Sequence, residues 1–428
     1  MNQDVFILGT GNSGRAAAAL LARDGVRGRV CTETNPPPGE MEWFANHGFP
    51  CTDQLPESGA DLAVISPGFP TEHPWLQRLR ERGVPQVPEF ELGAGHLRGK
   101  IVAVTGSLGK TSMVLFAAHL LRGKGLSVTV SGNIGTPVCE TALKTPDADV
   151  HVMELSSFQT EAAVAYRPDA GILLNLLPNH LDRHRTMEAY ARAKARMFAH
   201  QTPADLAVLP KDYPVSVPGR GRRLSPETDR VPDLRGTRLD HPALRSNLAA
   251  LLTGLREWHW VPAEIRAAAE TFEFPPHRME EVGNAQLGRV INDSKSTCLQ
   301  ATFAALQGEQ GRVHLIMGGV PKGDDPAVLV PVLRRLNLCL YLFGACAEAY
   351  SRAWKPYVEA CGVYDDLEAC LHAVFLKRKH TETLLFSPGC ASFDQYSGYE
   401  ARGRHFCRLV HARDPDLFFV THQAKESS

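Results

Sequence analysis

Short apolar runs alternate with stretches of helical pattern along most of the chain. Seven of these runs each lead into a turn, as a buried strand does: DVFIL, KIVAVTG, DVHVMEL, AGILLNL, RVHLIMGG, CLYLFG and TLLFSPG. Strands that are buried on both faces and separated by helices are typical of parallel sheets. The chain is therefore predicted to have an α/β fold built on parallel sheets.

Two breaks rich in Pro and Gly divide this pattern. The first is VPEFELGAGHLRGK at residues 87–100, and the second is FEFPPHR at residues 272–278. We therefore expect three domains, at residues 1–93, 94–274 and 275–428. Between about 205 and 240 the sequence has little periodicity, so we expect loops and short strands there.

Composition excludes several classes of protein. The net charge of −1, from 46 basic and 47 acidic side chains, gives no electrostatic reason to expect nucleic acid as a partner. Ten cysteines without a CxxC pair indicate reduced thiols, and neither a disulfide framework nor a zinc site. The N-terminus lacks a basic leader, and no apolar run approaches about 18 residues. We expect a cytoplasmic protein with no membrane partner.

The stretch VTGSLGKTS, residues 104–112, has the chemistry of a phosphate-binding loop but an unusual spacing. The general pattern places a Gly five residues before the Gly-Lys pair, where this chain has Val104. Gly106 lies only three residues before Gly109. The loop nevertheless follows an apolar run and precedes an amphipathic helical stretch, as a phosphate loop does. Lys110 can reach phosphate oxygens, and the Thr111 hydroxyl can bind Mg²⁺.

A second glycine-rich turn, GTGNSG at residues 9–14, follows the first apolar run. With Glu33 about 20 residues later, it fits a dinucleotide fingerprint. A glycine turn at a helix N-terminus binds any phosphate, so the pyrophosphate of a UDP-sugar fits equally well. A purely structural turn is the third interpretation.

Three polar side chains follow later strands of the same central region. Glu154, in MELSSFQTE, ends an apolar run and is a candidate Mg²⁺ ligand, or a strand-end glutamate in an ion pair. His180, in NLLPNHLDRH, follows the next run, where a lone histidine is more often structural. Lys194 lies in the helical stretch MEAYARAKARMFAH, where the ordinary interpretation is a solvated cation.

The last third of the chain has four loop segments of similar chemistry. They are PHR at 276–278, INDSKST at 291–297, MGGVPKG at 317–323 and SPGCASFDQYSGYEARG at 387–403. Small residues, hydroxyls and isolated lysines after apolar runs are the composition of a site for an anionic substrate. The pattern does not identify the anion.

Together and in this order, these motifs resemble those of the Mur ligases, the ATP-dependent amide-forming enzymes of peptidoglycan synthesis. VTGSLGKTS is similar to the family loop TGTNGKT/S, which tolerates the short spacing. ELSSFQ, GNIG, HLDR, NDSK and SPGCASFDQYSGYEARG look like segments of the branch of the family that adds D-glutamate. The resemblance extends from about residue 5 to 410.

This resemblance implies a three-domain architecture. A Rossmann-like domain would bind the UDP substrate, a central domain with a P-loop ATPase-like parallel sheet would bind ATP, and a C-terminal Rossmann-like domain would bind the amino acid. The implied activity is an ATP- and Mg²⁺-dependent ligation of D-glutamate to UDP-N-acetylmuramoyl-L-alanine through an acyl phosphate. The implied protein is a monomer.

The resemblance also assigns site residues. The catalytic residues would be Lys110, Glu154, His180 and Lys194, with Lys194 carbamylated. The metal ligands would be Thr111, Glu154, His180 and Lys194. ATP would contact Gly106, Ser107, Gly109, Lys110, Thr111, Ser112, Asn247, Arg278 and Asp293. The UDP-muramoyl substrate would contact Ser13, Glu33, Thr34, Ser66 and Asn133, with Ser156 and Gln159 near its phosphate or carboxylate. D-glutamate would contact Lys295, Thr297, Lys322, Ser392, Phe393 and Tyr399.

The chain departs from the family pattern at three places. Leu108 stands where the loop usually has Asn, and Ala243 and Leu244 replace the His and Asn of an HNxxN segment that ends at Asn247. The acidic residue that commonly precedes His180 is also absent. The alternatives are another Mur or folylpolyglutamate-type ligase, an acceptor ending in L-serine, a non-catalytic nucleotide-binding relative, and a nicotinamide-dependent dehydrogenase.

Overall fold

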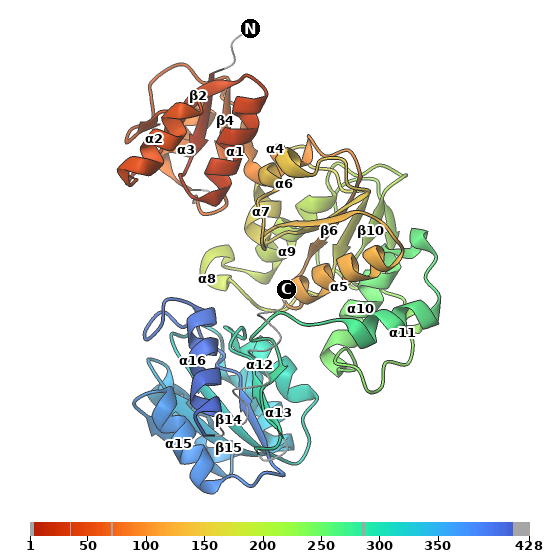
Figure 1. The fold of residues 1–428 in the computed structure, drawn as a ribbon, viewed down its shortest axis with the longest axis vertical. Helices are drawn as coiled ribbons and strands as arrows, with labels where there is room; N and C mark the ends of the chain where they lie inside the picture. The colour runs from red at the N-terminus through yellow and green to blue at the C-terminus, as the bar shows by residue number, and fades with distance from the viewer. Residues whose placement is uncertain (1–3, 35, 70–71, 285–286, 414–428) are drawn as a thin grey trace. The chain divides into compact units, whose positions relative to one another are not determined.

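The computed structural model describes residues 4–34, 36–69, 72–284 and 287–413. Its architecture is α/β, with three separate sheets that follow one another along the chain (Figure 1). All seven apolar runs form strands, which confirms the predicted fold class. Each sheet is the centre of one layered region with helices on both faces.

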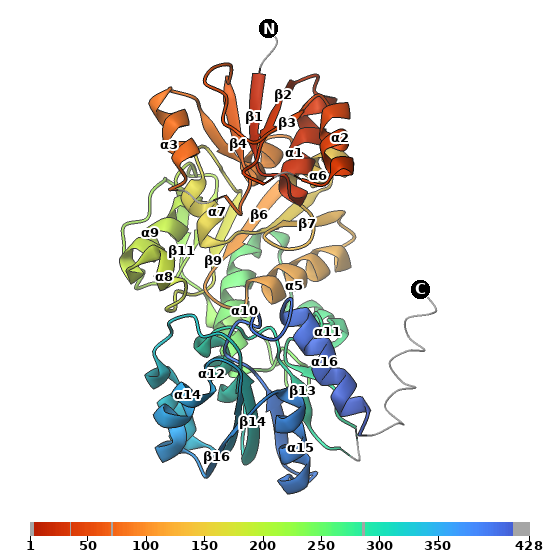
Figure 2. The same ribbon diagram turned by 90° about the vertical axis from the view of Figure 1, so that its left-hand side faces the viewer.

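The first sheet has the strand order β3-β2-β1-β4-β5, and all its strands are parallel. Its strands are β1 (Asp4–Leu8), β2 (Arg27–Cys31), β3 (Cys51–Thr52), β4 (Leu62–Ile65) and β5 (Gln86–Pro88). Its helices are α1 (Asn12–Arg23), α2 (Pro38–Asn46), α3 (Pro74–Glu81) and α4 (Glu89–Ala94). Helices α1 and α2 pack on one face and α3 on the other (Figure 2). The chain reverses its direction of strand addition between β1 and β4, and ligands bind beside the carboxyl ends of strands at such a point.

The second sheet has the order β11-β10-β9-β6-β8-β7 and is also entirely parallel. Its strands are β6 (Lys100–Thr105), β7 (Val128–Gly132), β8 (Val150–Glu154), β9 (Ala170–Leu173), β10 (Leu206–Val208) and β11 (Arg222–Leu224). The α-helices of this part of the chain are α5 (Lys110–Gly123), α6 (Val138–Lys144), α7 (Ser157–Ala162), α8 (Leu181–His184), α9 (Met187–Ala195), α10 (Pro242–Gly254) and α11 (Pro262–Thr271). Short 3-10 helices lie at Arg196–Phe198, Thr228–Arg230 and Arg256–Trp258. Residues 205–240 form loops and short strands, as predicted.

The third sheet has the order β12-β13-β17-β14-β15-β16 and is parallel except for β12. Its strands are β12 (Glu280–Glu281), β13 (Val290–Asn292), β14 (Arg312–Gly318), β15 (Asn337–Phe343), β16 (Ala360–Tyr364) and β17 (Thr383–Phe386). Its α-helices are α12 (Leu299–Gln307), α13 (Val330–Arg335), α14 (Ala347–Trp354), α15 (Leu367–Lys377) and α16 (Tyr399–His411), and 3-10 helices lie at Pro326–Leu329 and Lys355–Tyr357.

Alternation along β14 shows why these runs are almost continuously apolar. Leu315 and Met317 pack with α12, α13 and α14, whereas Ile316 packs with α15 and α16. Both faces of the strand are therefore buried, so apolar residues occupy consecutive positions.

The chain packs as two compact units. One comprises Met1–Leu176, Thr186–Leu239 and Arg245–Phe272, and it contains the first and second sheets. The other comprises Leu177–Arg185, Asp240–Leu244 and Glu273–Ser428, and it contains the third sheet. The domain boundaries at residues 93/94 and 274/275 stay predictions.

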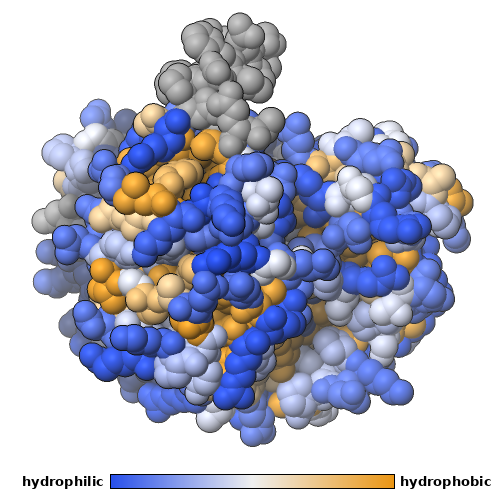
Figure 3. All heavy atoms as spheres, turned by 90° about the horizontal axis from the view of Figure 1, so that it is seen from below, coloured by the Kyte–Doolittle hydropathy of each residue, from blue (hydrophilic) through white to orange (hydrophobic). Residues whose placement is uncertain are grey.

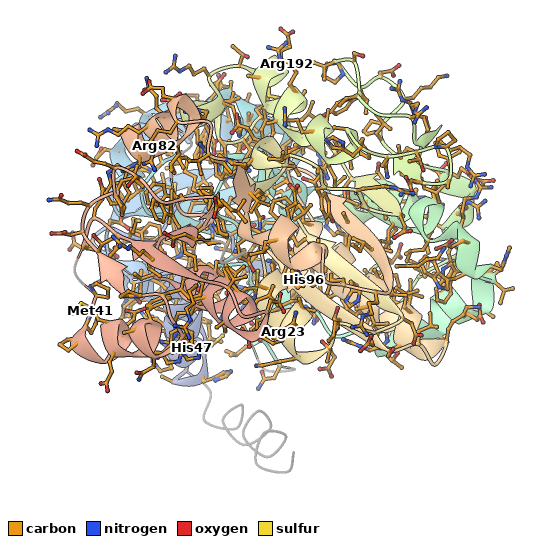
Figure 4. All side chains as sticks on the ribbon, turned by 90° about the horizontal axis from the view of Figure 1, so that it is seen from above. Arg23, Met41, His47, Arg82, His96 and Arg192 are labelled. Carbon is orange, nitrogen blue, oxygen red and sulfur yellow. The ribbon has the colours of Figure 1, made fainter. Side chains whose placement is uncertain are left out.

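Within the first unit, α4 packs closely against the start of α6. A Cβ atom on Gly93 would lie 2.5 Å from the backbone nitrogen of Cys139, so only glycine allows this approach. The Cys139 N–H also donates to Glu89 Oε1 at 2.7 Å, which satisfies one of the N–H groups at the start of α6. Nearby, Arg23 and His96, labelled in Figure 4, contact the Asp24 carboxylate at 2.8 and 2.9 Å.

The surface carries hydrophobic residues in small groups among hydrophilic ones on the face shown in Figure 3. Within the described residues, no helix combines the length and the apolar character needed to cross a membrane.

Glu89 predicts a pH dependence of stability. Its side chain is 2% exposed, and burial raises its pKa to about 7, against partial lowering by the hydrogen bonds from Cys139 and Val138. The folded chain therefore binds this proton more tightly than the unfolded chain, so this group's contribution to stability falls as pH rises from about 4.5 to 7.

Glu89→Gln keeps the acceptor oxygen but does not titrate. The melting temperature of this variant minus that of the parent chain should therefore increase by roughly a few degrees between pH 5 and pH 8, because only the parent chain loses stability through this group. A difference that stays constant across this range would contradict the assignment.

Candidate functional site

The predicted phosphate loop connects β6 to α5. Gly106 has φ 153° and Gly109 has φ 81°, and both values lie in the region that favours glycine. A Cβ atom on Gly109 would also lie 2.4 Å from Nδ2 of Asn247. Thr111 and Ser112 follow Lys110 in the first turn of α5, the end of a helix that attracts anions. The short spacing therefore forms the strand, loop and helix that the sequence predicts.

Two lysines converge on one carbonyl oxygen in this loop. Nζ of Lys110 donates to Gly106 O at 2.8 Å, and Nζ of Lys194 donates to the same oxygen at 3.0 Å. The Lys194 side chain is 1% exposed, and its Nζ lies 4.5 Å above the ring of Tyr190. Burial, and next the charge of Lys110, lowers the pKa of Lys194 well below its usual value. Lys194 is therefore a buried amine whose neutral form is easier to reach than that of an exposed lysine, and the interpretation as a solvated cation is wrong.

Glu154 ends β8 beside this loop, because β6 and β8 pair in parallel with Val104 opposite Glu154. Its carboxylate is 2% exposed, and Oε1 accepts a hydrogen bond from Nδ2 of Asn133 at 2.9 Å. Oε2 is buried and has no hydrogen-bond partner among the described residues. A buried carboxylate oxygen without a partner is costly, and a bound cation would remove that cost.

The donor set at this edge fits Mg²⁺. This ion prefers oxygen ligands and takes only one or two carboxylates from the protein. Glu154 offers one unpartnered oxygen, and the hydroxyl of Thr111 lies in the first turn of α5. His180 precedes α8 with φ 55° and belongs to the second unit, so its role as a metal ligand stays a prediction.

Ser156 and Gln159 form a capping box at the start of α7. Gln159 N–H donates to the Ser156 hydroxyl at 3.3 Å, and Ser156 N–H donates to Gln159 Oε1 at 3.0 Å. These bonds satisfy backbone groups that the helix leaves open. The structure thus gives both residues a structural role, and their contact with substrate stays a prediction.

The predicted UDP-muramoyl residues of the first sheet lie at the carboxyl ends of its strands. Ser13 is in the first turn of α1, Glu33 and Thr34 follow β2, and Ser66 follows β4. A Cβ atom on Gly14 would lie 2.0 Å from Gly9 O, which explains the glycine spacing. The Ser66 hydroxyl is buried without a hydrogen-bond partner among the described residues. The Glu33 carboxylate is largely exposed and contacts His73 Nε2 at 2.9 Å.

Asp293 follows β13 and organises the third sheet's edge. Its Oδ2 accepts hydrogen bonds from the hydroxyls of Ser296 at 2.5 Å and Ser387 at 2.8 Å. Burial raises its pKa to about 6, against lowering by these bonds and by the charge of Arg278. The contacts of Asp293 and Arg278 with ATP stay predictions.

Four of the predicted D-glutamate residues form two pairs. Nζ of Lys322 donates to the Thr297 hydroxyl at 3.1 Å. Nζ of Lys295 lies 3.8 Å above the ring of Tyr399. Ser392 is buried, whereas Phe393 is 75% exposed. These residues come from the segments after β13, β14 and β17, which are neighbours in the sheet.

Arg402 belongs to the segment 387–403 and supports this edge, although it is not among the predicted site residues. Its side chain is fully buried, and its guanidinium donates to the carbonyls of Ser294, Gly318 and Cys390 at 2.9, 3.1 and 3.0 Å. Burial lowers its pKa to about 10, so it stays charged at neutral pH. Arg402 ties together three of the segments that carry the predicted amino-acid site.

His277, Glu280 and Cys407 bring three possible metal ligands within 4.8 Å of one another. The amide nitrogen of Asn292 lies 2.8 Å from His277 Nδ1, 3.3 Å from Glu280 Oε2 and 3.1 Å from Cys407 Sγ. The Asn292 amide therefore occupies the space between the three ligand atoms, and the cluster is a hydrogen-bond network.

Comparison with known proteins agrees with this geometry. Residues 104–222 match the Mur ligase middle domain. The chain is 38% identical over 416 residues to the UDP-N-acetylmuramoylalanine--D-glutamate ligase of Nitratidesulfovibrio vulgaris, covering 94% of this chain and 95% of that one. It is 34% identical over 445 residues to the enzyme of the same name from Solibacter usitatus, covering 96% and 98%.

Among solved structures, MurF ligase from Thermotoga maritima in complex with ADP shares the fold, with a TM-score of 0.59 and 18% identity over 96% of both chains. The three sheets thus correspond to the three-domain Mur ligase architecture. The chain belongs to the Mur ligase family, among its UDP-N-acetylmuramoylalanine--D-glutamate ligases.

Proposed function

We propose that this chain ligates D-glutamate to UDP-N-acetylmuramoyl-L-alanine with ATP and Mg²⁺, a step of peptidoglycan precursor synthesis. The ligase activity follows from the family, and the named relatives support the choice of substrates. The observation that carries the proposal is the edge of the second sheet. There two lysines share Gly106 O next to a buried glutamate with one unpartnered oxygen.

The residues at this edge suit activation of a carboxylate by ATP. The carboxylate of the L-alanine group attacks the γ-phosphorus, the bond to the β-phosphate oxygen breaks, and ADP leaves. Lys110 would neutralise charge on the transferring phosphoryl group. When bound at Thr111 and Glu154, with His180 and Lys194 as further predicted ligands, Mg²⁺ would supply further neutralisation.

The residues at the edge of the third sheet suit an amino acid with two carboxylates. Lys322 and Lys295 would contribute positive charge, and the Thr297 and Ser392 hydroxyls would donate hydrogen bonds. The neutral amine of D-glutamate then attacks the acyl phosphate, inorganic phosphate leaves, and the nitrogen loses a proton to give the amide. Exclusion of water would protect the acyl phosphate from hydrolysis.

Lys194 is proposed to carry a carbamate. Its neutral amine adds to the carbon of CO₂, a C–N bond forms, and one proton is released, which turns the neutral amine into an anion. Burial and the neighbouring Lys110 favour the neutral amine that this reaction needs. An anion at this position would also relieve the repulsion between two cations at Gly106 O.

The proposal includes a monomer that acts in the cytoplasm, without a nucleic acid or membrane partner. All ten cysteines are free thiols, which is the usual state in a reducing compartment. A net charge of −1 favours no polyanion.

Phosphate release tests the proposed reaction. With ATP and Mg²⁺, release should require both UDP-N-acetylmuramoyl-L-alanine and D-glutamate, since the acyl phosphate forms on one substrate and is consumed by the other. The assay compares D-glutamate with L-lysine and meso-diaminopimelate, and the L-alanine acceptor with its L-serine analogue. Strong hydrolysis of ATP alone, or a preference for L-lysine, would count against the proposal.

Lys322→Ala tests the amino-acid site. Removing a charged hydrogen bond to a carboxylate costs about 1.5–3 kcal/mol, so KM for D-glutamate should rise by roughly tenfold or more. KM for ATP should change little. Lys377→Ala, at the exposed end of α15 in the same unit, is the matched control. Equal effects of Lys322→Ala on both KM values would place Lys322 outside the amino-acid site.

Lys194→Ala tests the carbamate. The variant should be nearly inactive because the anion is lost, and millimolar formate or acetate should partly restore turnover by filling the vacated space. Lys144→Ala, an exposed lysine in α6, should keep full activity with or without added carboxylate. Full activity of Lys194→Ala would exclude the carbamate and leave the ligase assignment in place.

A further inference from the structure

Asn175, two residues after β9, makes an unusual set of contacts with the phosphate loop. Its Oδ1 accepts hydrogen bonds from the backbone N–H groups of Ser107 at 3.1 Å and Leu108 at 3.0 Å. Its Nδ2 donates to Leu108 O at 2.9 Å and to Asn247 Oδ1 at 2.8 Å. The two lone pairs and two N–H groups of one side-chain amide are all used.

Within the loop, Nζ of Lys110 donates to the carbonyls of Gly106 and Ser107 at 2.8 and 3.3 Å, whereas the backbone of Leu108 is held by Asn175 from outside the loop. Gly106 and Gly109 give the loop conformational freedom, and restricting such residues to one conformation costs backbone entropy. Leu108 is apolar, so its position is fixed through its backbone N–H and C=O, both bound by Asn175. The backbone oxygen of Asn175 accepts a further bond from Ser107 N–H at 3.2 Å. Residues 107 and 108 are thus fastened to the end of β9.

The contact with Asn247 extends this order to α10. The Asn247 side chain is buried, and its Nδ2 lies 2.4 Å from the point where a Cβ on Gly109 would sit. Asn175, Asn247 and Gly109 therefore interlock at the start of α5. Displacing the Asn175 amide would release both the loop and the side chain of Asn247.

We propose that Asn175 is a positioning residue for the nucleotide phosphates. It holds residues 107 and 108 so that the amino end of α5, beginning at Lys110, meets the phosphates in one fixed arrangement. This inference rests on the proposed use of ATP. The role of Asn175 also explains why the loop can have Leu at position 108. The backbone of residue 108 is held by Asn175, which lies outside the loop, so a polar side chain at position 108 is not needed for this purpose.

Two substitutions separate the parts of this role. Asn175→Asp keeps the shape, but turns both donors into acceptors that face Leu108 O and Asn247 Oδ1, and it adds negative charge beside the phosphates. Asn175→Ser removes the amide and leaves space for water to reach the unpaired groups. The aspartate variant should therefore be the more severe.

The experiment is calorimetric titration of the full chain with Mg²⁺ and ADP. Loss of buried hydrogen-bond partners should raise Kd for ADP by about tenfold or more in Asn175→Ser, and further in Asn175→Asp. Asn46→Ala, exposed at the end of α2 in the same unit, should bind ADP within twofold of the parent chain. In turnover assays KM for ATP should rise while KM for D-glutamate stays unchanged, which a general loss of folded protein would not produce.

Binding of ADP by the Asn175→Ser variant within twofold of the parent chain would overturn the positioning role while the proposed reaction stands. Failure of the parent chain itself to bind ADP would instead overturn the proposed use of ATP, and the inference with it.

Discussion

Two lysines share a single carbonyl oxygen at the end of β6, and the chemistry of the second sheet follows from this constraint. Two ammonium groups at 2.8 and 3.0 Å from Gly106 O repel each other strongly in a buried site. Burial distinguishes the two lysines, because the Lys194 side chain lies on the buried side of α9 and its pKa is lowered well below the usual value. In the proposed function, Lys110 is the cation that binds phosphate, and CO₂ converts the Lys194 amine to an anion. With the unpartnered oxygen of Glu154, that anion would make the edge a cation site beside a phosphate site.

In each of the two units, fixed polar groups hold loops that contain glycine. Asn175 fastens the phosphate loop through three side-chain hydrogen bonds, and Arg402 fastens the third sheet's loops through three carbonyls. In both cases the partners are backbone groups at the carboxyl ends of parallel strands, where backbone hydrogen bonding within the sheet stops. Arg402 has no ion pair with a carboxylate among the described residues, and burying such a charge is costly, so the order that it gives to three segments must balance that cost.

Sequence patterns predict the strands and the glycine turns well, because both depend on local chemistry. The apolar runs locate β6, β8 and β9, and the two glycines of the phosphate loop have the positive φ values that their spacing implies. The side-chain contacts are harder to predict from the sequence, because they join residues that lie far apart in the chain. Asn175 meets its partners across 67 to 72 positions, Arg402 meets Ser294 across 108, and the pKa of Lys194 depends on Lys110. Ser156 and Gln159 are an exception, because their contacts with each other follow from a local S-x-x-Q capping signal, while their contact with substrate stays a prediction.

The central claim is that ATP activates the L-alanine carboxylate at the edge of the second sheet. Isotope transfer tests it most directly: UDP-N-acetylmuramoyl-L-alanine labelled with ¹⁸O in both carboxylate oxygens is converted with ATP and D-glutamate, and the phosphate is analysed by mass. An acyl phosphate leaves one labelled oxygen in the inorganic phosphate and the other in the new amide. Unlabelled phosphate at full turnover would show that the carboxylate is never phosphorylated, and would contradict the account.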